Sequence, residues 1–240
     1  MKTFGRNGIA LLALLAAAGP APAQAPSAEA VVAAAKAAMG GSAWDRIEGC
    51  HEQGTHGDGA IAYQTWFRLT GYGMRVDGRR GDSVRSNGFN GHVSWRAADG
   101  AAPQVSTDEA QLREAVTTAF VSSNGFFFPD RFPAAMRYLR EAEHDGRRFD
   151  VVEIVPERGR ALEYWFDRGD HYLRRVVDPR DAVTVEAGDY RRVGDLAVAF
   201  SLVVSAPDGT VQDRGALTSL VCGPTDAGLF DPPPVRGERG

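Results

Sequence analysis

The sequence predicts a mainly β protein of the α+β type, with an antiparallel sheet of about ten strands and a few helices covering one face. Three runs of alternating apolar residues indicate the sheet: Phe149–Val155, Leu162–Phe166 and Tyr172–Val177 are separated only by turn-forming residues. Connections this short hold no crossover helix, so the runs are consecutive antiparallel strands. Within the middle run, Tyr164 faces one side of the sheet and Trp165 the other. The side that carries Tyr164 is strongly apolar, so the rest of the chain has to cover it.

The N-terminal residues 1–23 have the layout of a secretory signal peptide. Lys2 and Arg6 precede the apolar run Ile9–Ala18, and a segment of small residues follows. An Ala-x-Ala segment offers a cleavage site after about Ala23, and a cut two residues later is less favoured because a proline would follow it closely. We therefore expect an exported protein. The rest of the sequence has no run of the roughly 20 apolar residues that a membrane-spanning helix needs.

We expect the mature chain to form one domain over residues 24–233, because no low-complexity linker divides it. Residues 234–240 form a charged, glycine-containing tail that we expect to be disordered. The formal net charge is −4 at pH 7, and the arginines are scattered with no basic stripe. This charge pattern gives no electrostatic case for a nucleic-acid partner.

The two cysteines, Cys50 and Cys222, lie at opposite ends of the mature chain. In an exported protein such a pair is more often a disulfide than a reactive site or half of a metal site. A disulfide would require the first and last strands to be neighbours, or nearly so. Two unrelated buried thiols are the alternative.

The elements outside this central region follow from alternation and turn signals. An alanine-rich helix is expected over Ser27–Met39, ending at Gly40-Gly41, which suit a helix C-cap. Further strands are expected at Ile47–Thr55, Ile61–Leu69, Met74–Asp77, Ser83–Asn87, Val93–Ala97, Val183–Tyr190, Leu196–Ser205 and Val211–Val221.

Two helices are predicted between the strands. Ser106–Val121 carries apolar residues at helical spacing, and Ser106 and Glu109 have the spacing of a capping box. A second, short helix is predicted from Pro133 to about Ala142. We expect these two helices to cover the apolar face of the sheet.

No catalytic or metal-binding pattern stands out. The sequence has no nucleophile elbow, zinc-protease motif, phosphate-binding loop or dinucleotide fingerprint. His51, His56 and Asp58 are close in sequence, but they lack a further ligand at matching spacing. We assign no catalytic residue, no metal site and no cofactor.

Several short motifs, in this order and spacing, resemble those of the outer-membrane lipoprotein-sorting protein family, the superfamily of the periplasmic lipoprotein carrier LolA. They follow the alanine-rich opening helix and are Phe89-Asn90-Gly91-His92 with Trp95, Trp165-Phe166-Asp167, Asp189-Tyr190-Arg191 with Val193-Gly194, and Leu229-Phe230. The resemblance spans roughly residues 27 to 233. It implies an incomplete antiparallel β-barrel whose concave apolar face is covered by helices and accepts acyl chains.

On this basis we expect a hydrophobic cavity lined by one face of the strands and by the helix over 106–121. The candidate lining residues are Tyr63, Phe67, Leu69, Val151, Leu162, Tyr164 and Phe166 from strands and Leu112, Val116 and Phe120 from the helix. Phe126, Phe127 and Phe128 are a candidate lid, because three consecutive aromatic residues do not all point inward from a regular element. The alternatives are an ordinary closed core without ligand space and a buried loop.

The expected function is that of a periplasmic, non-catalytic binding protein or carrier for an acyl, lipid or lipoprotein ligand. An alternative is an envelope protein-interaction module whose barrel is filled by its own side chains. A third hypothesis, an enzyme acting on envelope lipids or peptides, requires a polar cluster with a perturbed carboxylate or histidine in the cavity.

Overall fold

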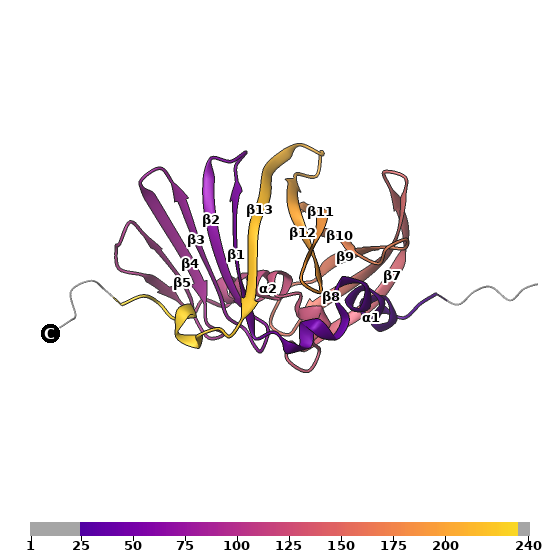
Figure 1. Ribbon diagram of the computed structural model, residues 1–240, viewed down its shortest axis with the longest axis horizontal. Helices are drawn as coiled ribbons and strands as arrows, with labels where there is room; N and C mark the ends of the chain where they lie inside the picture. Colours follow the sequence, from indigo (N-terminus) through magenta and orange to yellow (C-terminus); the bar gives the residue numbers. More distant parts are fainter. Residues whose placement is uncertain (1–24, 235–240) are drawn as a thin grey trace, which may run out of the picture.

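The computed structural model describes residues 25–234, and in them a thirteen-stranded antiparallel sheet forms the framework (Figure 1). The strands are β1 (Gly49–His56), β2 (Ile61–Arg68), β3 (Met74–Arg80), β4 (Ser83–Phe89), β5 (Ser94–Ala98), β6 (Gln104–Ser106), β7 (Ala134–His144), β8 (Arg147–Pro156), β9 (Leu162–Asp167), β10 (Leu173–Val177), β11 (Thr184–Val193), β12 (Leu196–Ser205) and β13 (Val211–Gly223). The signal peptide expected over 1–23, and all but the first residue of the tail expected over 234–240, lie outside the described residues.

The helices are few and short. They are α1 (Ala28–Met39), α2 (Glu109–Ser122) and the 3₁₀ segments η1 (Gly41–Arg46), η2 (Gly125–Phe127) and η3 (Ala227–Phe230). None of the helices between residues 25 and 234 has the length and apolar character needed to cross a membrane.

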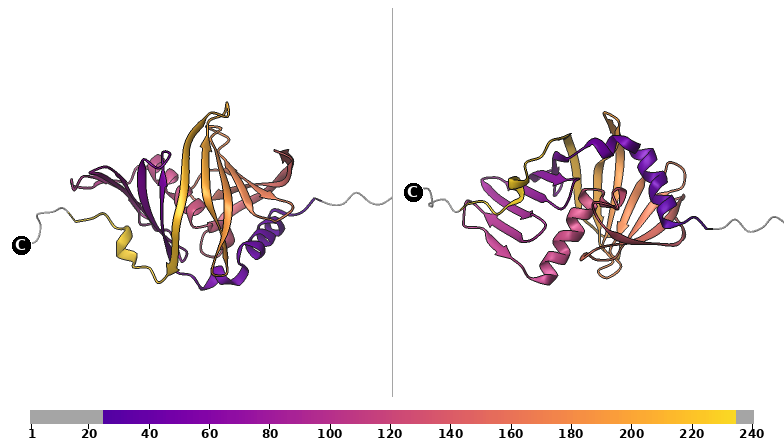
Figure 2. Two further views of the ribbon diagram at one scale, coloured as in Figure 1. Left: turned by 45° about the horizontal axis from the view of Figure 1, so that its top comes forward. Right: turned by 90° about the horizontal axis from the view of Figure 1, so that it is seen from below.

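The sheet is open, with β6 and β7 as its two edges. The strand order is β6-β5-β4-β3-β2-β1-β13-β12-β11-β10-β9-β8-β7, so β13 inserts between β1 and β12 and joins the two halves of the sheet. The chain passes from one edge strand to the other through α2 and η2. Seen from below, α1 and α2 lie across the same side of the sheet (Figure 2). The fold is therefore mainly β, with one antiparallel sheet that is not closed and few helices, as the predicted fold class required.

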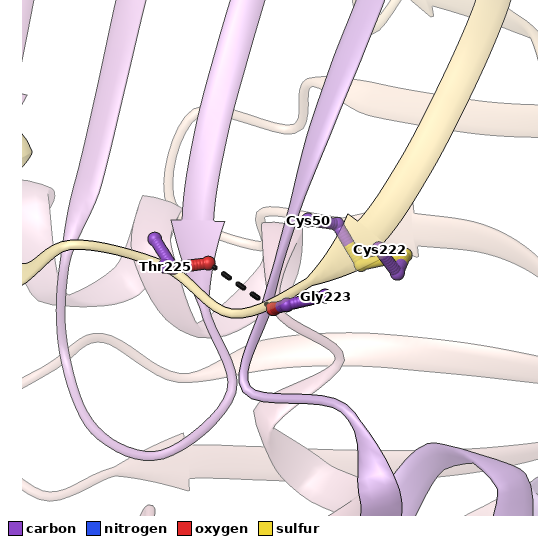
Figure 3. Close-up of a disulfide and its surroundings, with 4 residues drawn as sticks. All are labelled: Cys50, Cys222, Gly223 and Thr225. Atoms are coloured by element: carbon purple, nitrogen blue, oxygen red, sulfur yellow. Dashed lines mark hydrogen bonds between the residues drawn. A yellow bond between two sulfur atoms is a disulfide. The ribbon is translucent and has the colours of Figure 1, made fainter.

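The predicted pairing of the first and last strands is confirmed, and so is the disulfide. Cys50 and Cys222 are directly opposite each other on β1 and β13, with their Cα atoms 4.0 Å apart, and their sulfur atoms are bonded (Figure 3). Just beyond the disulfide, the Thr225 hydroxyl donates to the carbonyl oxygen of Gly223 at 3.4 Å.

The main core lies on the face of the sheet that the helices cover, which we call the helix-covered face. Cys50 and Phe67 are opposite each other there on β1 and β2, and Val152 and Tyr164 are opposite each other on β8 and β9. They belong to one apolar cluster with residues of α1, η1, α2 and η2. Residues that are opposite each other on neighbouring strands share a face, and successive residues along a strand alternate between faces. The positions of Cys50, Phe67, Val152 and Tyr164 therefore determine which other strand residues lie on the helix-covered face.

The helix predicted from Pro133 to Ala142 is wrong: this segment is β7, an eleven-residue edge strand paired with β8. The register of β7 shifts between Tyr138 and Arg140, so Leu139 is an extra, bulged residue. Met136, Tyr138 and Leu139 therefore have a spacing that looks helical in the sequence, although the strand merely changes phase at the bulge.

The second unpredicted strand is β6, which takes up the start of the segment predicted as helix. Ser106 ends β6, and α2 begins at Glu109 after Asp108, whose side chain accepts a hydrogen bond from the backbone N–H of Gln111 at 3.0 Å. Asp108 is thus the N-cap in place of Ser106. Added to the eleven strand segments that the sequence predicts individually, β6 and β7 make up the thirteen observed.

Candidate functional site

Helix α2 is anchored to the rest of the molecule through its C-terminal half. Val116, Ala119 and Phe120 are buried, whereas Glu109 and Gln111 in the first turn are exposed. Thr117 adds a polar anchor, because its hydroxyl oxygen accepts a hydrogen bond from the backbone N–H of Arg160 at 2.8 Å. In the N-terminal half, Leu112 and Ala115 pack against the cluster that contains Phe89 but are only partly buried, so this half of α2 is less deeply buried than the C-terminal half.

A cleft of about 460 Å³ lies between α2 and strands β3 to β6. Its apolar side chains on the helix-covered face are Met74, Val76 and Phe89 from the sheet and Ala115 from α2. The remaining lining residues are Asn87, Gly88, Ser94, Trp95, Arg96, Gln104, Ser106, Gln111, Glu114 and Thr118. The volume lies in the range typical of small-molecule sites.

A second cavity, of about 290 Å³, lies on the other flank of α2. Leu112 and Val116 line it from the helix, Phe89 lines it from β4, and Gly91, Glu109, Arg113 and Arg158 complete it. Phe89 thus contributes to both cavities, and α2 is bordered by space on both sides. Leu112 and Val116 are the two predicted lining residues that the structure places at a cavity.

Most of the other predicted lining residues lie inside the main core. Phe67, Leu69, Phe120, Leu162, Tyr164 and Phe166 are all buried and belong to the same apolar cluster. Tyr63 is half-buried and lies on the helix-covered face of β2, opposite Gly54.

The prediction that Val151 and Tyr164 line the same face of the sheet is wrong. Val151 is opposite Trp165, whereas its neighbour Val152 is opposite Tyr164. The chain of β8 is apolar at both positions and buried at both, so alternation alone did not reveal which of the two valines faces the helices.

The three phenylalanines predicted as a lid are buried in η2 and just after it. The ring centroid of Phe126 lies 5.3 Å from that of Tyr164 and 6.0 Å from that of Phe166, with edge-to-face geometry in both cases. Phe127 contacts Trp44 of η1, with ring centroids 6.0 Å apart. In this structure they fill the centre of the helix-covered face, as in the buried-loop alternative.

Of the two charged side chains that line the cleft, Glu114 forms ion pairs with other described residues and Arg96 does not. Glu114 of α2 forms ion pairs with Arg160 at 2.6 Å and with Arg180 at 3.4 Å. Arg96 of β5 instead donates to the amide oxygen of Gln111 across the cleft at 3.4 Å. Within residues 25–234, no carboxylate lies within 4.0 Å of the Arg96 guanidinium.

A second polar group, Glu52 of β1, lies on the helix-covered face outside this cleft. It is opposite Thr65 on β2 and Leu220 on β13. Burial raises the pKa of the Glu52 carboxyl to about 7, and a hydrogen bond from Thr65 partly offsets this effect.

Among the described residues no group of three or more His, Cys, Asp or Glu side chains is arranged to hold a metal ion.

Sequence reasoning missed Arg96, Glu52 and the cleft residues Met74 and Phe89. The available signal was the alternation of β3 and β4, which puts Met74, Val76 and Phe89 on the face that carries Phe67. The sequence does not show that α2 leaves space above these residues.

The comparisons with known proteins found similar structures but no match to the sequence. No family model matches the sequence, and no curated protein matches it. A DUF1329 family protein from Desulfovibrio piger is similar in structure with a TM-score of 0.55, covering 85% of this chain and 97% of its own at 11% identity. A LolA superfamily protein from Nitrosomonas europaea is similar with a TM-score of 0.54, covering 86% and 98% at 13% identity. The chain therefore has the fold of the LolA superfamily, as the motif resemblance predicted.

Proposed function

We propose that this protein is an exported, periplasmic binding protein or carrier that holds an acyl, lipid or lipoprotein ligand between α2 and strands β3 to β6. The observation that carries the proposal is the cleft of about 460 Å³ beneath a helix whose fully buried residues all lie in its C-terminal half. Binding and release proceed by displacement of the N-terminal half of α2, without covalent chemistry.

The energetics favour an apolar ligand. Met74, Val76 and Phe89 line the sheet side of the cleft and Ala115 lines the α2 side, and each methylene group that leaves water contributes about 0.8 kcal/mol. The Cys50–Cys222 disulfide supports an oxidising compartment outside the cytoplasm. The structural similarity to a LolA superfamily protein supports an envelope role.

The test is to fill the cleft. Ala115→Trp places a large side chain among the cleft residues, whereas Ala110→Trp adds the same side chain at an exposed position on α2. We expect Ala115→Trp to weaken binding of a fluorescent fatty-acid probe at least about tenfold, a loss of about 1.4 kcal/mol, and Ala110→Trp to leave it unchanged. Thermal melts of both variants check that the fold is retained.

Equal binding by wild type and Ala115→Trp would contradict the proposal. So would ligand-free native mass spectra of protein purified from its own periplasm, combined with no binding of the probe.

One feature favours the alternative of a protein-interaction module. β7 is an edge strand of eleven residues, and among the described strands only β8 pairs with it. A partner segment can extend such an edge by β-augmentation. Exposed charged side chains on β7 oppose non-specific pairing of this edge with other strands; they are Arg137, Arg140, Glu141 and Glu143. Protection of β7 amides by an envelope extract, with the α2 cleft unaffected, would favour this alternative.

A further inference from the structure

The polarity of the α2 cleft changes systematically across the sheet. One row of residues in register on the helix-covered face runs from Val76 on β3 through Asn87 on β4 and Arg96 on β5 to Gln104 on β6. The row beside it consists of Met74, Phe89, Ser94 and Ser106. Both rows are apolar at β3 and polar at β5 and β6, so the cleft has an apolar inner end and a polar end at the open edge of the sheet.

Arg96 is the positive charge at the polar end. It is exposed, its one hydrogen bond to a side chain is to the neutral amide of Gln111, and no carboxylate of residues 25–234 neutralises it. Glu114, the acidic residue of the opposite wall, is engaged by Arg160 and Arg180. The charge at this end is therefore positive and available to a ligand.

We propose that the ligand of the cleft is an anionic amphiphile, whose carboxylate or phosphate head is held by Arg96 while its alkyl chain lies against Met74, Val76 and Phe89. This inference rests on the proposed function and names the chemical class of its ligand. Arg96 then replaces its weak contact with Gln111 by a charge-assisted pair with the head group.

The chemistry of the polar end fits such a head. A guanidinium group presents parallel N–H donors that match the two oxygens of a carboxylate or a phosphate. The side-chain amides of Asn87 and Gln104, in register on either side of Arg96, supply further neutral donors. A cationic head would meet the guanidinium instead, and only the already paired Glu114 would attract it.

The test compares three probes with the same chain: dodecanoate, dodecyl phosphate and dodecanol. The variants are Arg96→Gln and, as a matched control, Arg85→Gln. Arg85 is also an exposed arginine on the helix-covered face, on β4, but it does not line the cleft. Affinities are measured by displacement of a fluorescent fatty-acid probe at low and high salt.

We expect wild type and Arg85→Gln to bind one or both anionic probes about tenfold or more tightly than dodecanol. Arg96→Gln should bind all three probes equally, to within about twofold, and Arg96→Lys should recover part of the preference. The preference should shrink as salt rises, because Arg96 is exposed. Tighter binding of dodecanoate indicates a fatty-acid type of ligand, and tighter binding of the phosphate a phospholipid type.

The outcomes separate the two proposals. If dodecanol binds and wild type shows no preference for an anion, or if Arg96→Gln keeps the preference, the anionic head is refuted while an apolar binding cleft stands. If none of the three probes binds, the proposed function fails and this inference fails with it.

Discussion

A single glycine allows Trp95 to lie against the sheet. A Cβ atom at Gly88 would come within 2.3 Å of the indole ring of Trp95, far inside van der Waals contact. The indole N–H of Trp95 in turn donates to the carbonyl oxygen of Phe230 at 2.8 Å, which holds η3 in place. A side chain at position 88 therefore displaces both the ring and the C-terminal segment.

We predict that Gly88→Ala lowers the free energy of unfolding by about 1 to 3 kcal/mol through this overpacking. Gly78→Ala is the matched control on the neighbouring strand, because the nearest atom to its added Cβ is 3.8 Å away. Urea denaturation of both variants measures the difference. Similar losses in both would show that the contact between Gly88 and Trp95 has no special role.

The carboxyl of Glu52 makes stability depend on pH. Burial raises its pKa to about 7 in the folded protein, from an ordinary value of 4.5. Between these two values the folded state binds the proton more tightly than the unfolded state, so the contribution of Glu52 to stability is complete below about pH 4.5 and is lost as the pH rises through about 7.

We predict that wild type loses about 1 to 3 kcal/mol relative to Glu52→Gln between pH 4.5 and pH 8, since glutamine does not titrate. The measurement is the unfolding free energy of both proteins across this pH range. Other titrating groups contribute equally to both proteins, so their contributions cancel in the difference between the two free energies. A difference that is constant with pH would contradict the assigned burial of Glu52.

Helix α2 has two halves with different anchoring. Its C-terminal half contributes the buried Val116, Ala119 and Phe120, while its N-terminal half lies between two cavities. Local stability follows buried contacts, so the two halves should open with different free energies. We predict faster amide hydrogen exchange at residues 113–115 than at residues 117–121, and slower exchange at 113–115 once a fatty acid is bound. Uniform exchange along the helix would show that α2 moves as one unit.

The sheet was largely predictable from the sequence because its turns are explicit and its strands alternate. The two strands that were missed are both edge strands, and each has a local reason. β7 contains a bulge at Leu139, which breaks the alternation, and β6 has only the three residues Gln104–Ser106. Neither edge has a second neighbouring strand that would demand a regular apolar pattern.

The candidate site was much less predictable than the sheet. Alternation correctly placed Tyr164 and Phe166 on the face that the helices cover, but it does not show what fills the space above them. Phe126 packs against both rings and closes that region. The free space is instead displaced toward β3 to β6, where the positions of α2 and of Arg96 depend on contacts between segments distant in sequence.

The two halves of the molecule meet where β1 pairs with β13, and the Cys50–Cys222 disulfide fixes this junction. It joins residues separated by 172 positions, so in the chain-entropy model it restricts the unfolded chain by about 5 kcal/mol. The hydrogen-bonded pairing of β1 with β13 extends well beyond the bond, from Gly49 to Thr55. The fold should therefore persist without the disulfide, but with much lower stability.

We predict that the double variant Cys50→Ala/Cys222→Ala keeps the native circular dichroism spectrum and unfolds with a free energy about 3 to 5 kcal/mol lower than the oxidised protein. Cys50 is buried, so replacing it with alanine also has a packing cost. Reduced wild type keeps both sulfur atoms and therefore measures the loss of the disulfide alone. If the reduced protein is as stable as the oxidised one, then the two halves are held by strand pairing and the helix-covered core alone. If it loses its secondary structure, then the pairing of β1 with β13 depends on the covalent bond, and the open sheet has no stable form in a reducing compartment.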